Sequence, residues 1–217
     1  MCPMFDRIKR PLAGCLGCIG ALILLTFFAY ESQSFGQFDA RVLNRRTAYK
    51  GTALGRVANF FVHLGDPLPQ LALMALACLR GLSCGRRRQV IGALVLVGGA
   101  NLTTQFLKQS LEHQRYQPIL GYGQIGPTSF PSGHSTAAMG MALAFVLVLP
   151  RSPSPAVALL GAGFVLPVSY SVVVVHNHYP SDVLGGWLVA TGWGFGVSAG
   201  LRSVELLVSN HKAQIAK

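Results

Sequence analysis

Three short polar clusters stand next to apolar runs, and their side chains are of the kinds that handle phosphate. The first runs from Lys108 to Arg115, the second from Pro131 to His134, and the third from His178 to Asp182. Arginine neutralises phosphate through a bidentate fork, and lysine does so as a point charge. Lys108 and Arg115 are two helical turns apart, so they share one face if the helix continues. We therefore expect both cations to hold phosphoryl oxygens.

The second cluster predicts a helix start that binds an anion. Ser132 and the backbone N–H groups near Gly133 would lie at a helix N-terminus, where the free N–H groups and the helix dipole attract negative charge. Gly133 lets the backbone approach a phosphate closely, because it has no Cβ. Ser132 and Gly133 are therefore candidate phosphate ligands.

Two histidines and one aspartate complete a set suited to phosphoryl transfer. One histidine can attack phosphorus while another protonates the leaving oxygen, and Asp182 can hold His178 in the productive tautomer. His134 and His178 are the candidates because each stands in a cluster that opens an apolar stretch. The sequence contains no His, Cys or carboxylate cluster with metal-ligand spacing, so we expect no metal and no cofactor. The other histidines are interpreted as polar residues at the membrane interface: His63, His113, His176 and His211.

The chain that must position these clusters is far more apolar than a soluble domain. AVILMFWYC residues make up 51% of the 217 residues and charged residues only 12%, about half the usual share. This composition excludes a disordered chain and argues against a soluble globule. The net charge is +11, but the charges stand between apolar runs and form no continuous stripe. We therefore expect no nucleic-acid partner.

Six apolar stretches are each long enough to cross, or nearly cross, a hydrocarbon core about 30 Å thick. They cover residues 12–30, 57–79, 90–107, 135–149, 156–175 and 183–208, and Gly65-Asp66-Pro67 interrupts the second. Helices are expected because the backbone in lipid must satisfy its own hydrogen bonds. We predict an all-α fold, a polytopic membrane bundle of about six transmembrane helices, in one domain over residues 1–217.

The placement of Lys and Arg favours cytoplasmic N- and C-termini in the inner membrane, with the three polar clusters on the extracytoplasmic side. The basic connection from Glu31 to Arg56 opposes this bias, and we interpret it as an interfacial helix against anionic headgroups. Asp66 is an acid within an apolar run, which indicates a functional site. Asp-Pro is equally typical of a turn at the membrane surface.

At these residues the sequence resembles the type 2 phosphatidic acid phosphatase (PAP2) superfamily, whose signatures are K-x6-R-P, P-S-G-H and S-R-x5-H-x3-D. Pro131 to His134 match the second signature in full. Lys108 and Arg115 match the first, although Tyr116 replaces its proline. The motifs span about 75 residues directly, and their order and spacing make the resemblance specific.

The third signature is matched with one departure. Ser171, His178 and Asp182 stand at the right spacing, but Val172 occupies the arginine position. Loss of that arginine removes one phosphate contact, worth about 2–4 kcal/mol of transition-state binding. We expect Val172 near the outer end of its helix, where an arginine would reach the site. A nearby histidine could supply a replacement donor, either His113 or His176.

The resemblance implies that His178 is the nucleophile that forms a phosphohistidine, that Asp182 orients it, and that His134 is the acid for the leaving group. It also implies a set of groups that hold the phosphoryl oxygens without a metal: Lys108, Arg115, Ser132 and Gly133. The implied function is a membrane phosphatase with a lipid phosphate substrate. Phosphatidate, phosphatidylglycerol phosphate, an isoprenyl diphosphate and lipid A all fit.

Two alternatives stay open at this point. The same fold could transfer the phosphoryl group to another lipid or a sugar. With Val172 at the arginine position, the chain could instead bind a lipid phosphate without turnover. A transporter fits less well, because the ionisable residues gather at one membrane face instead of lining the midplane.

Overall fold

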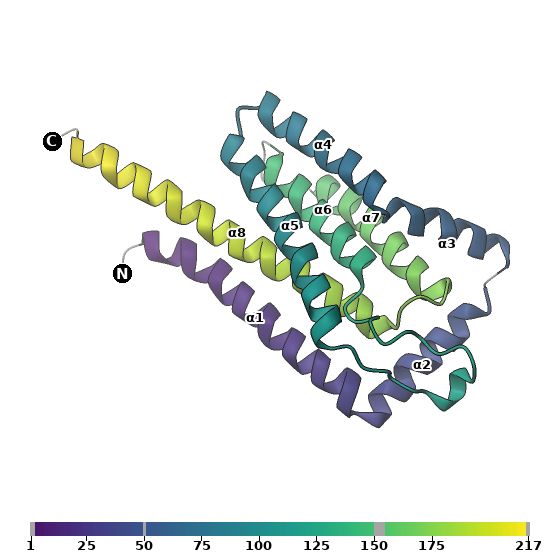
Figure 1. Ribbon diagram of the computed structural model, residues 1–217. Coiled ribbons are helices and arrows are strands. Elements are labelled where there is room, and N and C mark those ends of the chain that lie inside the picture. Colours follow the sequence, from purple (N-terminus) through teal and green to yellow (C-terminus); the bar gives the residue numbers. More distant parts are fainter. Residues whose placement is uncertain (1–2, 50, 150–154, 216–217) are drawn as a thin grey trace.

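The computed structural model describes residues 3–49, 51–149 and 155–215, and all regular structure within these ranges is helical (Figure 1). A short 3-10 turn, η1 (Pro118–Leu120), lies in the long loop between α5 and α6. This confirms the predicted all-α fold. The helices, in chain order, are α1 (Pro3–Glu31), α2 (Gln33–Thr47), α3 (Ala53–Leu64), α4 (Pro67–Ser83), α5 (Arg87–Ser110), α6 (Gly133–Val148), α7 (Pro155–Val174) and α8 (Pro180–Ile215).

Five of the six predicted apolar stretches each fall on one helix, and 57–79 falls on the pair α3 and α4. Fewer of the described helices than expected can cross a membrane by length and composition. Three qualify: Ile8–Glu31, Arg87–Ser110 and Pro155–Val174. The pair α3 and α4, bent by 56° at residues 65–66, makes a fourth if it forms one broken span. Helix α6 is apolar but has 16 residues, about 24 Å at 1.5 Å per residue. Helix α8 has 36 residues but is only moderately apolar, because glycines and charged side chains interrupt it.

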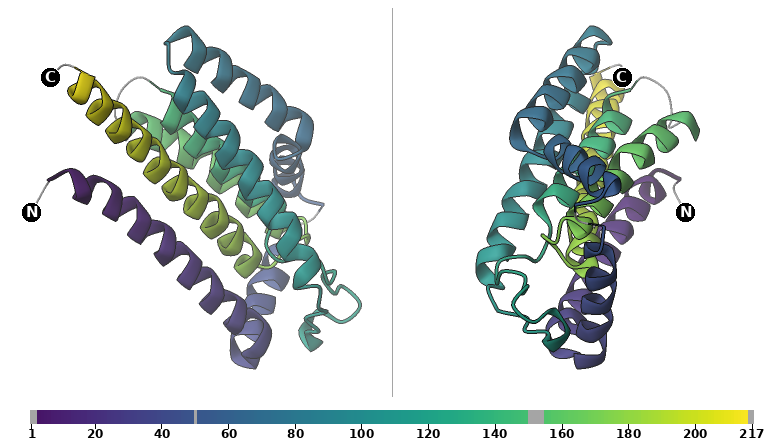
Figure 2. Two further views of the ribbon diagram at one scale, coloured as in Figure 1. Left: turned by 60° about the vertical axis from the view of Figure 1, so that its left-hand side comes forward. Right: turned by 90° about the vertical axis from the view of Figure 1, so that its right-hand side faces the viewer.

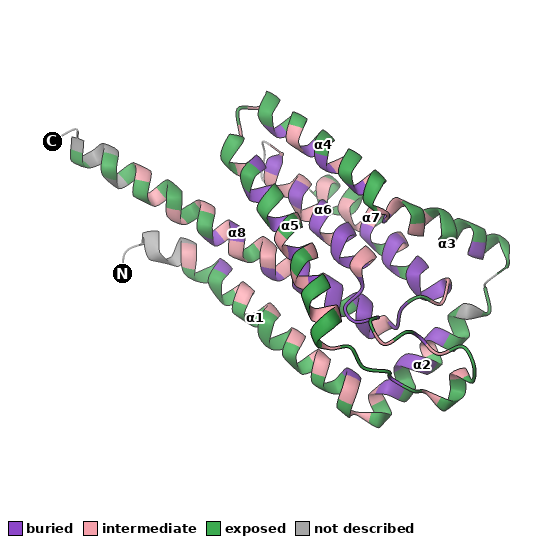
Figure 3. Cartoon of the chain, in the orientation of Figure 1, coloured by how far each residue is buried: buried purple, intermediate pink, exposed green. Residues whose placement is uncertain are grey.

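Helix α6 and the first half of α8 form the centre of the bundle. In Figure 3 many residues of these segments are buried, whereas most residues of α1 and α4 are exposed or only partly buried. Helix α6 contacts α4, α5, α7 and α8, and α1 lies along α8 (Figures 1 and 2). Leu16, Ile23 and Phe27 of α1 are all more than half exposed, as expected for a helix whose outer face meets lipid.

The two chain termini and the three polar clusters lie at opposite ends of the bundle. The first turns of α1 and the last turns of α8 lie at one end (Figure 1). Helix α2, the loop over residues 111–132 and the turn between α7 and α8 lie at the other end. The three polar clusters all belong to this second end. The fold therefore brings together segments that are up to about 70 residues apart in the chain.

Candidate active site

A cavity of about 750 Å³ lies between the α3–α4 bend, α5 and the start of α6. Each of the three polar clusters contributes to its wall, through Lys108, Gly133 with His134, and His178. Asp66 from the bend is the fourth charged or titratable contributor. The rest of the wall continues along α4, α5 and α6 and is largely apolar, with residues such as Leu71, Met74, Leu94, Val97 and Met141.

His178 is held in place by Asp182. The Nδ1 atom of His178 lies 3.3 Å from Oδ2 of Asp182, and the same oxygen accepts a hydrogen bond of 2.9 Å from the Tyr179 N–H. The turn that carries His178 is tight, because its own N–H and that of Asn177 both donate to the carbonyl of Val172, at 3.2 and 3.0 Å. With Nδ1 committed to the carboxylate, Nε2 is the nitrogen available for chemistry in the cavity.

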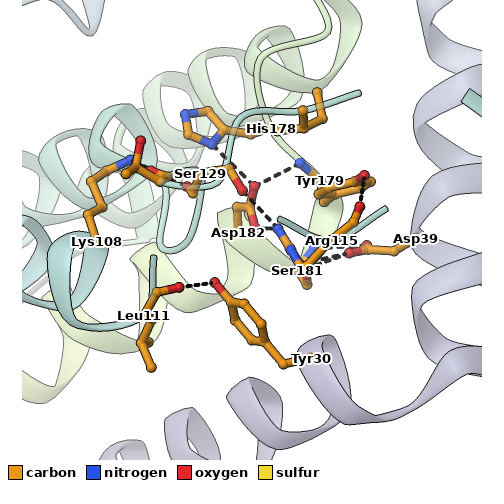
Figure 4. A network of polar contacts seen from close by, with 12 residues as sticks. Tyr30, Asp39, Lys108, Leu111, Arg115, Ser129, His178, Tyr179, Ser181 and Asp182 are labelled. Atoms are coloured by element: carbon orange, nitrogen blue, oxygen red, sulfur yellow. Dashed lines mark hydrogen bonds and ion pairs between the residues drawn. The ribbon is translucent and has the colours of Figure 1, made fainter. Parts of the chain in front are cut away.

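The other oxygen of the Asp182 carboxylate pairs with Arg115. In Figure 4 the Arg115 guanidinium lies between Asp182 and Asp39, and its Nη1 atom is 3.7 Å from Oδ2 of Asp39. The guanidinium carbon also stacks over the Tyr179 ring, 4.4 Å from the ring centroid. Only 7% of the Arg115 side chain is exposed, and Arg115 does not line the cavity.

Lys108 and Arg115 would share a helix face only if one helix continued through both residues, and this condition is not met. Helix α5 ends at Ser110, so Arg115 lies in the following loop, where two buried carboxylates draw it inward. Lys108 stays on the helix and lines the cavity. Its Nζ donates to the carbonyl of Thr128 at 2.8 Å and contacts that of Ser129 at 3.4 Å. Lys108 thus fixes the loop that leads into α6 and also forms part of the cavity wall.

Helix α6 begins as the sequence predicts, with Ser132 as its N-cap and Gly133 as its first residue. The Ser132 hydroxyl accepts a 3.4 Å hydrogen bond from the Ser135 N–H, and its own N–H donates to the Asp182 carbonyl at 2.9 Å. Ser132 is fully buried, whereas Gly133 lines the cavity. The helix start therefore presents backbone N–H groups, rather than the serine hydroxyl, to an anion in the cavity.

Asp39 of α2 is a site residue that the sequence did not single out. Its carboxylate accepts hydrogen bonds from the Ser181 N–H, at 3.0 Å, and from the Ser181 hydroxyl. Burial raises the pKa of Asp39 to about 6, although the Ser181 hydrogen bonds and the Arg115 charge oppose this shift. Glu31 and Asp39 are the acids of the basic segment 31–56, and that scarcity is a signal which could have identified Asp39.

His134 contacts Asp66, another residue of the cavity wall, with 3.3 Å between Nε2 and Oδ1. The second oxygen of Asp66 lies 2.9 Å from Nδ1 of His63, an exposed side chain at the end of α3. Asp66 thus occupies a turn, as one interpretation predicted, and also a position at the candidate site, as the other did. Within the described ranges, no group of three or more His, Cys, Asp or Glu side chains is placed to hold a metal ion.

Val172 lies in the last turn of α7, as expected, but it does not line the cavity that an arginine at this position was expected to reach. It is fully buried in an apolar cluster with Leu43, Ile125 and Tyr179, because the last turn of α7 is covered by α2 and by the long loop. The two candidate replacement donors also lie elsewhere. His113 is exposed beside the Tyr30 ring, and the Nε2 atom of His176 contacts the Gly123 carbonyl.

Comparison with known proteins identifies the class. The PAP2 superfamily model matches residues 89–203, more than half of the chain, and the chain belongs to this superfamily. The matched region contains α5 to α8 up to Ser203 and with them Lys108, His134 and His178. Together with the candidate spans, this membership makes the chain an integral membrane protein of a phosphatase family.

Two individual relatives extend the comparison. The lipid A 1-phosphatase of Rhizobium etli is 34% identical over 103 residues. The match covers 43% of this chain and 42% of the relative, so it spans less than half of either. The crystal structure of a transmembrane PAP2-type phosphatidylglycerolphosphate phosphatase from Bacillus subtilis superposes with a TM-score of 0.70. It covers 85% of this chain and 94% of that chain at 21% identity, which shows a shared fold.

Proposed function

We propose that this membrane protein hydrolyses the phosphate monoester or diphosphate of a lipid through a phosphohistidine on His178. The observation that carries the proposal is the pairing of His178 Nδ1 with Asp182 Oδ2 at 3.3 Å, on a histidine that lines the same cavity as Lys108 and His134. A carboxylate in this position fixes the tautomer and stabilises the positive charge that develops on the imidazole during attack.

The reaction proceeds in two displacements at phosphorus. In the first, Nε2 of His178 forms a bond to phosphorus, the bond to the lipid oxygen breaks, and that oxygen takes a proton from His134. In the second, water attacks the phosphohistidine, His134 takes the proton of the water, and the N–P bond breaks to release phosphate. Lys108 and the N–H groups at the start of α6 neutralise the phosphoryl oxygens in both steps.

The shape of the cavity supports a lipid substrate. Its polar groups gather at one end, while the wall along α4 and α5 is largely apolar, so a phosphate and a hydrocarbon chain would find matching surroundings. The two relatives are named for lipid A and phosphatidylglycerolphosphate. We propose these two lipids as the first candidates, followed by phosphatidate and isoprenyl diphosphates.

The proposed topology places both termini in the cytoplasm and the site on the extracytoplasmic side of the inner membrane. The separation of the termini from the site, at opposite ends of the bundle, supports this arrangement (Figure 1). The excess of Lys and Arg on the side of the termini supports it as well. We also propose that the reaction needs no metal, because Lys108 and helix N–H groups can supply the positive charge.

Phosphate release by the purified protein in detergent, measured on a panel of the four lipid classes with and without EDTA, tests the proposal. We expect release from at least one lipid, unchanged by EDTA and absent in the His178→Ala variant. Loss of activity in EDTA that Mg²⁺ restores would refute the metal-free mechanism. A protein that binds the lipids without turnover would instead be the non-catalytic binder that Val172 suggests.

A phosphotransferase uses the same phosphohistidine, so product analysis must separate it from a hydrolase. The same assay, repeated with an added lipid alcohol or sugar, distinguishes the two. A hydrolase yields inorganic phosphate in both cases, whereas a transferase yields a phosphorylated acceptor at the expense of free phosphate.

A further inference from the structure

The α3–α4 bend is built around His134. Helix α3 ends at Leu64 and α4 starts at Pro67, with a 56° change of direction. A Cβ atom on Gly65 would lie 2.6 Å from Cδ2 of His134, so the imidazole ring rests directly against the Gly65 backbone. A surface turn without a role at the site would not require this close approach.

Asp66 directs its carboxylate at histidines instead of at its own helix. It occupies the N-cap position of α4 but makes no capping hydrogen bond with its side chain. Pro67 and Pro69 have no N–H, so the Leu68 N–H is the donor that an aspartate could cap there. Its two oxygens lie 3.3 Å from His134 Nε2 and 2.9 Å from His63 Nδ1. The carboxylate therefore contacts the imidazole in place of a helix N–H group.

We propose that Asp66 is the positioning residue for His134: its carboxylate fixes the ring in the cavity and stabilises the imidazolium that protonates the leaving group. This inference rests on the proposed function. In the imidazolium both ring nitrogens carry protons. Asp66 binds the one on Nε2, and the proton on Nδ1 is transferred to the leaving oxygen. The neutral histidine that remains keeps its Nε2–H bonded to Asp66, ready to take a proton from water.

The charges around His134 explain why a carboxylate is needed there. Lys108 and His178 line the same cavity and repel a further positive charge on His134. His63 lies beyond the carboxylate and shares it. Asp66 is the acid that contacts the imidazole and offsets these cations. Without it, the acid form of His134 would be both less populated and less well oriented.

The test compares two substrates that differ in how much they need an acid. A lipid alkoxide is a poor leaving group and requires protonation, whereas p-nitrophenolate leaves without it. For Asp66→Asn we expect kcat/KM with the lipid phosphate to fall by about 10- to 100-fold. The loss with p-nitrophenyl phosphate should be smaller by at least about tenfold. The quantity kcat/KM is used because it reports on formation of the phosphoenzyme.

Two further variants make the test decisive. Asp66→Glu keeps a carboxylate beside the imidazole and should recover most of the lipid rate that Asp66→Asn loses, which a merely structural role in the bend would not explain. Glu112→Gln removes an exposed acid at the same end of the bundle and should leave both rates unchanged. Equal losses on both substrates, or no loss on either, would overturn the role of Asp66. A wild-type protein that releases phosphate from no substrate would overturn the proposed function itself.

Discussion

Asp182 joins Arg115 to His178 through its two carboxylate oxygens. Oδ1 pairs with the guanidinium, and Oδ2 lies 3.3 Å from Nδ1 of the imidazole. Arg115 therefore contacts the proposed nucleophile, His178, only indirectly, through the buried carboxylate of Asp182. Lys108, the lysine of the same motif, lines the cavity. This division of roles makes the two cations distinguishable by experiment.

Replacing Arg115 should cost stability as well as activity, whereas replacing Lys108 should cost mainly activity. Arg115→Ala leaves Asp182 and Asp39 buried without their cation, and breaking a buried ion pair in this way costs about 3–5 kcal/mol. Lys108→Ala removes a charge from the cavity wall. Thermal unfolding in detergent and kcat/KM, measured for both variants, check this. An Arg115→Ala protein that melts with the wild type would show that the guanidinium is not structural.

His178→Ala should abolish the covalent intermediate. Without the imidazole no phosphohistidine can form, and we expect kcat to fall by a factor of about 10³ or more. Rapid quenching after mixing with a ³²P-labelled lipid phosphate should trap acid-labile label on the wild type and none on the variant. His113→Ala is the matched control, because His113 is exposed and lies outside the cavity. Label on the His178→Ala protein would contradict the assignment.

Asp39 should make stability depend on pH in the mildly acidic range. Its pKa is raised from 3.8 to about 6 in the folded protein, so between these values the folded state holds a proton that the unfolded state has released. Stability from this group is therefore lost as pH rises from about 4 to 6, by at most about 3 kcal/mol.

Asparagine at position 39 cannot titrate, so the Asp39→Asn variant isolates the contribution of this carboxyl. The melting temperature of the wild type, relative to that of Asp39→Asn, should be higher at pH 4.5 than at pH 7. A difference that stays constant over this range would place the pKa of Asp39 near its ordinary value.

Gly186 should be required for the site to assemble. A Cβ atom there would lie 2.7 Å from the Ser132 carbonyl oxygen and 2.9 Å from the Thr136 N atom, and backbone atoms cannot move aside cheaply. Gly186→Ala should push α8, with Asp182, away from the start of α6, and both kcat/KM and the melting temperature should fall. Gly200→Ala, on the same helix with open space around it, should gain up to about 1 kcal/mol from helix propensity.

Arginine at position 172 should destabilise the protein. The Val172 side chain is fully buried among apolar side chains, and a guanidinium there would be a buried charge without a partner, a change that costs several kcal/mol. We expect Val172→Arg to lower the melting temperature and kcat/KM together. A rise in kcat/KM with unchanged stability would mean that the side chain reaches the cavity after all.

The sequence alone predicted the all-α fold and the helix start at Ser132, because long apolar runs and an N-cap serine are local signals. It also grouped Lys108, His134 and His178, which the fold brings to one cavity. The orientation of Arg115 was not predictable in this way. It depends on where α5 ends and on Asp39, a residue about 75 positions away, and no local pattern links the two.

The α3–α4 segment shows a different limit of sequence interpretation. The sequence allowed two interpretations of Asp66, as part of a turn and as a functional acid. In the structure Asp66 lies in a turn and also lines the cavity. The role of Asp66 at the site shows only in its contact with His134, which is 68 residues further along the chain and so leaves no local pattern in the sequence. By length and composition, three or four of the described helices qualify as spans, against six apolar stretches in the sequence, because α6 has only 16 residues and glycines and charged side chains interrupt α8.

The burial of Val172 also bears on how sequences of this family can change. Its neighbours Leu43, Ile125 and Tyr179 fill the space that a longer side chain would need. A single codon change from valine to arginine would therefore yield a poorly folded protein, and smaller neighbours would have to be present first. An arginine at this position therefore requires neighbours other than those that surround Val172 in this chain. We expect Val172→Arg to be tolerated only when Leu43, Ile125 and Tyr179 are replaced by smaller side chains at the same time.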